Sequence, residues 1–174
     1  MTAQAARTAR PLSPLRWLGL PMLLCATATV ILATPLRIYG LALPEPVFPL
    51  IVAFAWAVIR PSILPPFALL VLGLFLDVFW GGPQGLWPLC LLTAYAAVLG
   101  VRRLITGQDF LVMWAWYALV MAVAFGAGFL LMTMDAGEPP NLIAVAWQYL
   151  ATAALFPFAH RLIERYEDAD VRFR

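Results

Sequence analysis

Asp77 is the only acidic residue of this 174-residue chain that lies well inside an apolar run, here Ser62 to Trp80. A carboxylate at the centre of a bilayer costs about 2.5–3.5 kcal/mol on insertion scales, so its surroundings must compensate for that cost. Two interpretations are open. Asp77 binds a partner or lines a cavity, or it accepts hydrogen bonds from the backbone of the turn that follows. Both interpretations predict that Asp77 faces protein rather than lipid.

The other residues that could do chemistry do not form a recognisable set. The chain has one histidine, His160, at the end of its last apolar run, and two cysteines, Cys25 and Cys90, inside different runs. This number and spacing do not suit a zinc site or a disulfide framework, so the cysteines are expected to be small buried hydrophobes. A catalytic set around an embedded histidine and a Gly-rich phosphate loop are also missing from the sequence. We therefore expect no metal, no cofactor and no enzymatic activity.

Composition indicates the solvent that these residues meet. The chain is 64% hydrophobic and 11% charged, with a mean hydropathy of +0.89. A soluble domain is about half apolar and about a quarter charged, so this chain has too little polar surface for water. The apolar runs are separated by short polar breaks and leave no hydrophilic stretch for a second domain. The sequence predicts a single all-α bundle that crosses a membrane several times.

Six apolar runs are long enough to be considered as membrane spans. The second run opens with Pro44, Pro46 and Pro49 and is short, so it is either a tilted short helix or a partly re-entrant segment. The first run follows three Arg residues, as in a signal peptide, but further spans come after it, so we expect an uncleaved helix. The expected spans are 17–35, 43–59, 62–80, 86–101, 110–134 and 141–160, and the last helix continues into a cytoplasmic tail, 161–174.

The arginines predict the orientation of this bundle. All eleven basic residues are Arg, and they lie outside the apolar runs, before the first, in the breaks between them or after the last. With six spans and a cytoplasmic N-terminus, ten of them lie on the cytoplasmic side and only Arg37 lies outside. Removing the second span would place Arg60, Arg102 and Arg103 outside, against the positive-inside rule. The chain is therefore expected to have both termini in the cytoplasm, and it shows no contiguous basic face for nucleic acid.

Small and polar residues within the spans have two interpretations each. Thr93, Tyr95, Gln148 and Thr152 can hydrogen-bond between helices or line a cavity. Gly126 to Gly128 favours close helix packing, and it could also mark a flexible point in the long fifth span. The sequence alone does not decide between these interpretations.

The stretch from Ile59 to Leu86 carries an ordered motif. An Arg-Pro turn is followed by a helix that contains Gly-Leu-x-x-Asp, and then by a Gly-x-Pro-x-Gly-Leu turn. This order resembles the MreD family, the rod shape-determining membrane proteins of bacteria. The resemblance covers about 30 residues, and the rest of the chain matches mainly in hydropathy. The matching positions are Arg60, Pro61, Gly73, Asp77, Gly81, Gly82, Pro83 and Gly85, and the resemblance implies a structural or partner-binding role for them.

The resemblance implies a multi-pass protein of the bacterial inner membrane without catalytic activity. Its direct partner would be MreC, a single-span periplasmic protein, within an elongation complex that also holds MreB, RodA and a class B penicillin-binding protein. The MreD fold is similar to the vitamin-binding S component of energy-coupling-factor transporters. A small-molecule carrier of that type is therefore the alternative function, and an intramembrane enzyme is a third class.

Overall fold

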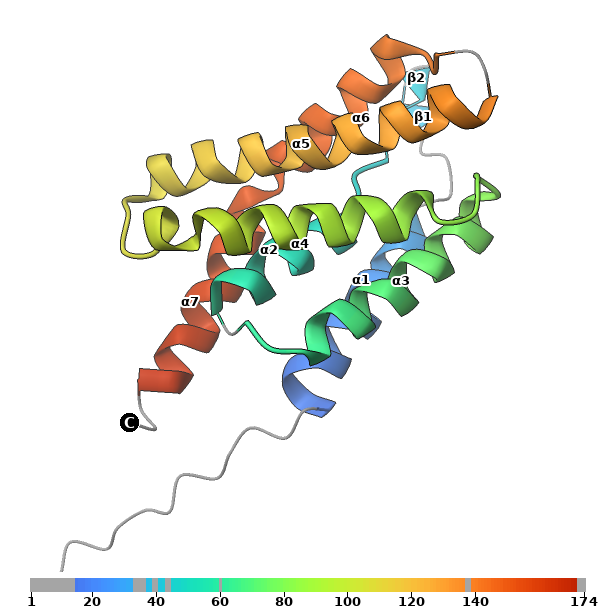
Figure 1. Ribbon diagram of the computed structural model, residues 1–174. Helices are drawn as coiled ribbons and strands as arrows, with labels where there is room; N and C mark the ends of the chain where they lie inside the picture. Colours follow the sequence, from blue (N-terminus) through green and yellow to red (C-terminus); the bar gives the residue numbers. More distant parts are fainter. Residues whose placement is uncertain are drawn as a thin grey trace, which may run out of the picture.

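The computed structural model describes residues 15–32, 37–38, 41–42, 45–59, 61–136 and 139–171. These residues form a helical bundle, with one small antiparallel hairpin in which Arg37 pairs with Ala42 (Figure 1). A π-helical turn, Leu15–Gly19, runs directly into the first α-helix. The elements are α1 Leu20–Leu32, β1 Arg37–Ile38, β2 Leu41–Ala42, α2 Phe48–Ile59, α3 Leu64–Trp80, α4 Leu86–Ile105, α5 Phe110–Ala136, α6 Leu142–Ala154 and α7 Phe156–Val171.

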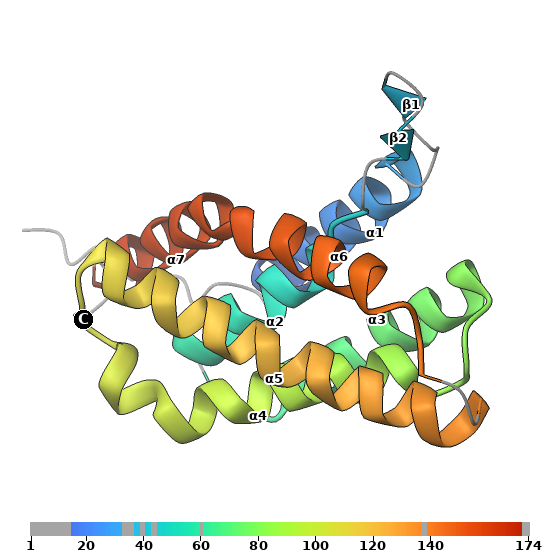
Figure 2. The ribbon, with the colours of Figure 1, turned by 90° about the horizontal axis from the view of Figure 1, so that it is seen from above.

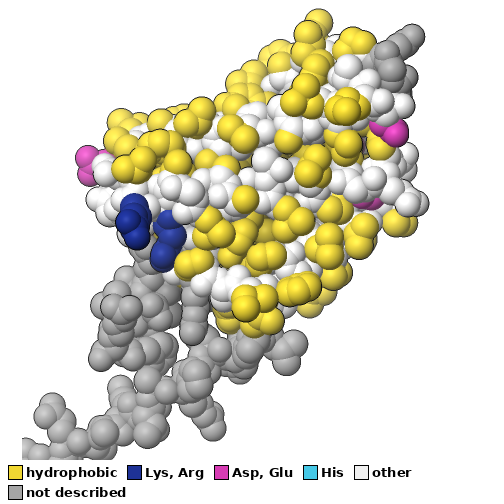
Figure 3. Space-filling view, in the orientation of Figure 1, with side chains coloured by type: hydrophobic (Ala, Val, Ile, Leu, Met, Phe, Trp, Pro, Cys, Tyr) yellow, Lys and Arg dark blue, Asp and Glu magenta, His cyan; other side chains and the backbone are white. Residues whose placement is uncertain are grey.

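The prediction of a helical membrane protein agrees with the lengths and surfaces of these helices. Three segments are long and apolar enough to cross a membrane, and these are Leu86–Ile105, Phe110–Asp135 and Leu142–Glu164. Three shorter apolar helices accompany them. Hydrophobic side chains cover most of the face seen in Figure 3. Such a surface suits lipid, because a soluble protein rarely exposes one large apolar patch.

Helix α2 is the centre of the bundle. Every residue from Leu50 to Val58 is buried, and the helix packs against α1, α3, α4 and α7. A helix that is apolar on all sides is stable only where neighbours surround it. Its 12 residues span about 18 Å at 1.5 Å per residue, which is less than the roughly 30 Å hydrocarbon core. The second apolar run is therefore a short helix that meets protein on every side.

The last apolar run differs from the expected single helix. The structure divides it into α6 and α7 at Leu155, and Figure 2 shows the two segments meeting at a bend. Pro157 explains the break, because proline has no N–H to donate and its ring clashes with the carbonyl four residues earlier, here Ala153. The expectation that the chain stays helical beyond His160 is confirmed, since α7 extends to Val171.

Candidate functional site

The carboxylate of Asp77 lies against the first turn of α4. Its Oδ2 accepts a hydrogen bond from the Gly85 N–H at 2.6 Å, and its Oδ1 accepts one from the Trp87 N–H at 2.9 Å. The side chain is only 3% exposed. Asp77 therefore faces protein, as both interpretations of the sequence predicted. The geometry confirms the second interpretation, in which the acid binds the backbone of the following turn.

This contact completes the hydrogen bonding at the start of α4. The first N–H groups of a helix have no partner within the helix, and an unpaired one is costly away from water. Besides the two donors that Asp77 accepts from, the Leu86 N–H donates to the Pro83 carbonyl at 3.2 Å. Pro88 has no N–H, and the Leu89 N–H begins the helical ladder by donating to the Gly85 carbonyl at 3.0 Å. The negative carboxylate also lies at the positive end of the helix dipole.

Two glycines allow the chain to turn between α3 and α4. Gly81 has a φ of 65° and its N–H donates to the Asp77 carbonyl at 3.0 Å, which closes the end of α3. Gly85 has a φ of 93° and precedes α4. This left-handed region costs other L-residues roughly 1–2 kcal/mol each. Gly82 and Pro83 lie between them. Gly81 and Gly85 are thus matched to the turn that brings Asp77 to α4.

Gly73 brings the two helices into contact one turn before Asp77. A Cβ atom at this position would lie 2.5 Å from the backbone nitrogen of Pro88 and 2.6 Å from its Cα. These distances are too short for any side chain, and the obstacle is backbone that cannot rotate away. Gly73 and Asp77 lie four residues apart, hence on the same face of α3. That face as a whole is shaped to receive the first turn of α4.

Of the remaining motif residues, Gly82 lies in the turn, Pro61 lies away from the junction, and Arg60 is not described by the structure. Pro61 is exposed in the segment that leads from α2 to α3. Arg60 falls on a position that the structure does not describe. Gly82 is partly buried in the turn, where a Cβ would make an ordinary contact with Leu86. The structure therefore brings Gly73, Asp77 and the Gly81–Gly85 turn together and leaves Pro61 apart.

A second set of polar contacts stabilises the break between α6 and α7. The sequence did not predict that these residues come together. The carbonyl of Thr152 accepts from the Tyr117 hydroxyl, and the carbonyl of Ala153 accepts from Trp114 Nε1, each at 3.0 Å. The Thr152 hydroxyl donates to the Gln148 carbonyl at 2.8 Å and accepts from the Val47 N–H at 3.1 Å. Neighbouring helices thus pair the carbonyls at the break, as apolar surroundings require.

Arg102, which was considered above only for its charge, also makes a contact between helices. Its Nε donates to the Val58 carbonyl at 3.0 Å, in the last turn of α2. The Val47 N–H at the other end of α2 is held by Thr152, so both ends of this buried helix are paired by side chains from other helices. Tyr95 also bonds between elements, through its hydroxyl to the Ser62 carbonyl at 3.3 Å. For Tyr95 and Thr152, the interhelical interpretation is the one that the contacts support.

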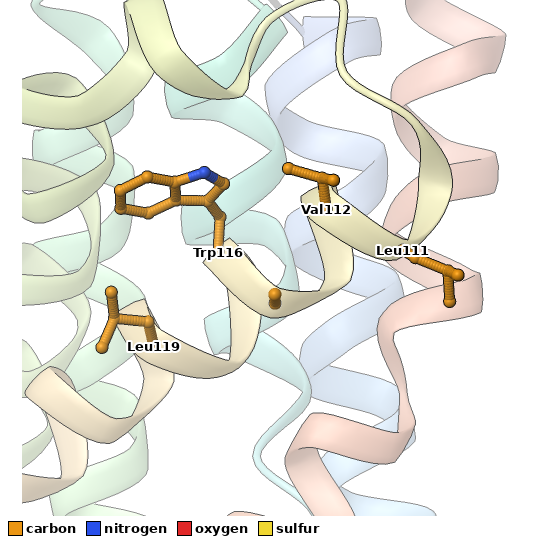
Figure 4. A pocket seen from close by; sticks show the side chains of 5 residues that line it. Leu111, Val112, Trp116 and Leu119 are labelled. Carbon is orange, nitrogen blue, oxygen red and sulfur yellow. The ribbon is translucent and has the colours of Figure 1, made fainter.

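Two hollows on the described surface are lined mostly by apolar side chains, which offer little chemistry for a small polar ligand. One of them, of about 340 Å³, lies along α5 and is lined by four aliphatic side chains and the indole of Trp116 (Figure 4). Val112, Trp116 and Leu119 follow one another at helical spacing along α5, and Leu111 adjoins Val112. Within the described part of the chain, no group of three or more His, Cys, Asp or Glu side chains could hold a metal ion. The hydrogen bonds described above therefore serve to position the helices.

Comparison with known proteins adds no information about these residues. No protein-family model, no curated protein and no solved structure matches this chain. The resemblance of Ile59 to Leu86 therefore rests on the order and spacing of its residues. The α3–α4 junction is the site at which that motif has a defined geometry.

Proposed function

We propose that this protein is a non-enzymatic component of the bacterial elongation complex that binds MreC at the inner membrane. The wider complex would hold MreB, RodA and a class B penicillin-binding protein. The observation that carries the proposal is the junction of α3 and α4. The ordered motif from Arg60 to Gly85 contains Gly73, Asp77, Gly81 and Gly85, and each of these four has a defined role in fixing the two helices.

The state of the Asp77 carboxylate favours a scaffold over an enzyme. Both of its oxygens accept backbone hydrogen bonds, from Gly85 and Trp87. A general acid or base must reach a substrate proton, and this carboxylate is directed at the backbone of its own chain. A costly buried acid is thus used to hold two helices at a fixed geometry. A rigid membrane surface of this kind is what a single-span partner needs for specific binding.

The arrangement of charge favours six spans with both termini in the cytoplasm. Basic side chains gather at one end of the face in Figure 3, where Figure 1 places the loop between α4 and α5. The turn between α3 and α4 lies at the other end of α4 (Figure 1). By the positive-inside rule the Asp77 turn would then face the periplasm. This is the side on which the soluble part of MreC lies, in a bundle that resembles the S component of energy-coupling-factor transporters.

The outer face of α3 is the surface that we assign to the partner helix. Phe67, Val71, Leu74 and Val78 are exposed and follow one another at helical spacing on one side of α3. The opposite side of the same helix carries Gly73 and Asp77 and is fixed to α4. The junction would therefore determine the angle at which this apolar face is presented. Because close packing drives helix association in membranes, the angle of this face affects the affinity for the partner helix.

Co-purification tests the function and the face separately. Tagged full-length protein is co-expressed with MreC from the same organism and purified in mild detergent, and we expect MreC to co-elute. Val71→Trp should weaken this complex at least about tenfold, or 1.4 kcal/mol. Leu119→Trp on α5 is the matched control, because Val71 and Leu119 are each 54% exposed.

Three outcomes separate the possibilities. If MreC does not co-elute with the wild-type chain, the proposed function is wrong, and saturable binding of a vitamin would then indicate the carrier. If MreC co-elutes but both tryptophan variants retain it equally, the function stands and the α3 face is wrong. If only Val71→Trp loses MreC, both parts of the proposal hold.

A further inference from the structure

Helix α6 is fixed at one end and loosely packed at the other. Near its C-terminus Thr152 and Ala153 are buried and take part in the contacts with α2 and α5. Near its N-terminus Leu142 is 67% exposed and Ile143 is 69% exposed. Segments with few buried apolar contacts are those that move most easily. The packing of α6 therefore weakens with distance from Leu155.

The fixed end of α6 has the properties of a pivot. The hydrogen bonding of the helix is interrupted at Leu155, because Pro157 has no N–H to donate. The carbonyls of Thr152 and Ala153 are held by Tyr117 and Trp114 of α5, outside the ladder. These bonds lie at the bend itself, so a change in the angle between α6 and α7 moves them little. Domain and helix motions concentrate their backbone changes at such element ends.

A groove between α5 and α6 leaves room for this movement. It measures about 280 Å³ and is lined by apolar side chains of both helices. Small residues lie on both of its sides, Ala122 and Gly126 on α5 and Ala146 on α6. A Cβ atom built at Gly126 would meet nothing within 4 Å. Small residues allow two helices to approach closely in a membrane, so the groove can narrow where Ala146 faces Ala122 and Gly126.

The contacts nearest the pivot are compatible with closing. The Tyr149 hydroxyl donates to the Ala118 carbonyl at 3.2 Å. The Tyr149 ring packs edge to face on Phe125, with 6.0 Å between the ring centroids. Tyr149 lies about 9 Å from Leu155 along α6, at 1.5 Å per residue, whereas Leu142 lies about 20 Å away. A small rotation at Leu155 therefore displaces Leu142 about twice as far as Tyr149.

We propose that α6 is an arm that pivots about Leu155 and alternates between this open groove and a closed form in which Ala146 packs on Gly126. The inference is independent of MreC, because it concerns two helices of this chain. Closing buries the apolar lining of the groove against protein. The state of the arm then determines whether the groove between α5 and α6 is open.

Distance measurement in nanodiscs tests the arm. Genetically encoded spin labels at Leu130 on α5 and Ile143 on α6 of the full chain report their separation, and we expect two populations of distances. Gly126→Leu fits the open groove but obstructs the closed form, so it should remove the shorter population. Gly100→Leu on α4 is the matched control, since Gly100 is likewise an exposed helical glycine whose added Cβ would meet nothing within 4 Å. This control should keep both populations.

The result that overturns the proposal is a single narrow distance in the wild-type chain. Identical distributions in the Gly126→Leu and Gly100→Leu variants would overturn it as well, because the closed form would then not involve Gly126. Pro157→Ala provides an independent check. Restoring the N–H should make the helical hydrogen bonding continuous through Leu155 and leave a single population of distances. Loss of MreC binding in any variant does not bear on this outcome.

Discussion

Asp77 and Gly85 are joined by the shortest polar contact of the α3–α4 junction, a 2.6 Å hydrogen bond from the Gly85 N–H to Oδ2 of the carboxylate. Asp77 lies in α3, and Gly85 directly precedes α4, eight positions later. The bond can form because Gly81 and Gly85 both adopt left-handed backbone angles in the intervening turn. One acid and two glycines thus fix how α4 follows α3.

Replacing Asp77 by Ala should destabilise the fold by about 1–3 kcal/mol, because the N–H groups of Gly85 and Trp87 lose their acceptor. Asp77→Asn should cost less, since an amide oxygen can still accept one of these bonds. The free energy of unfolding is measured by denaturant titration in mixed micelles. Asp135→Ala is the control, as Asp135 is exposed near the end of α5. Equal stability of the Asp77→Ala and Asp135→Ala variants would show that the carboxylate does not support α4.

Replacing Gly73 by Ala should separate α3 from α4. The new methyl group would overlap the backbone of Pro88 at 2.5 Å, and overpacking of this kind costs about 1–3 kcal/mol. The same change at Gly100, which is exposed on α4 with nothing within 4 Å of an added Cβ, should be neutral or stabilise by up to about 1 kcal/mol. Thermal unfolding followed by circular dichroism distinguishes the two variants. A Gly73→Ala protein that melts at or above the wild-type temperature contradicts the close approach.

The sequence predicted most of the helices and the protein environment of Asp77. Hydropathy, prolines and glycines act within one segment, so the boundaries of α3 and the turn after it were close to those expected. The cost of a charge in lipid likewise demanded that Asp77 face protein. The bond from Val47 to Thr152 spans 105 positions and could not be read in the same way. Partners across such separations depend on how the helices pack, which local patterns do not encode.

The break at Leu155 was missed although its signal was present. Pro157 lies within the last apolar run, and a proline inside a helical pattern ends or kinks the helix. Hydropathy continues without change through that point, so hydropathy alone predicts one helix for the whole run. The tolerance for the break comes from Trp114 and Tyr117, which lie about 40 residues earlier in the chain. The bond from Arg102 to α2 was not predicted for the same reason, because its partner lies 44 positions earlier.

Gly128 and Cys90 should be energetically coupled. A Cβ at Gly128 would lie 2.7 Å from the Cys90 sulfur, so Gly128→Ala forces the sulfur to move or the helices to separate. Cys90→Ala removes the obstacle and leaves space for the new methyl group. The loss of unfolding free energy in the double variant should therefore be smaller than the sum of the losses in the two single variants, by roughly 0.5–3 kcal/mol. A double-mutant cycle on unfolding free energies measures this, and strict additivity would exclude the contact.

Thr152→Val should destabilise the bundle more than the same change at Thr27. Valine keeps the shape of threonine but removes the oxygen that accepts from the Val47 N–H at 3.1 Å, so the start of the buried helix α2 loses a partner. The expected cost is about 1–3 kcal/mol. The Thr27 hydroxyl, in contrast, donates only to carbonyls of its own helix and is exposed, so Thr27→Val should change stability by less than about 0.5 kcal/mol. Hydrogen–deuterium exchange should show faster exchange at Val47 in the Thr152→Val variant alone, and unchanged protection there would mean that Thr152 does not hold α2.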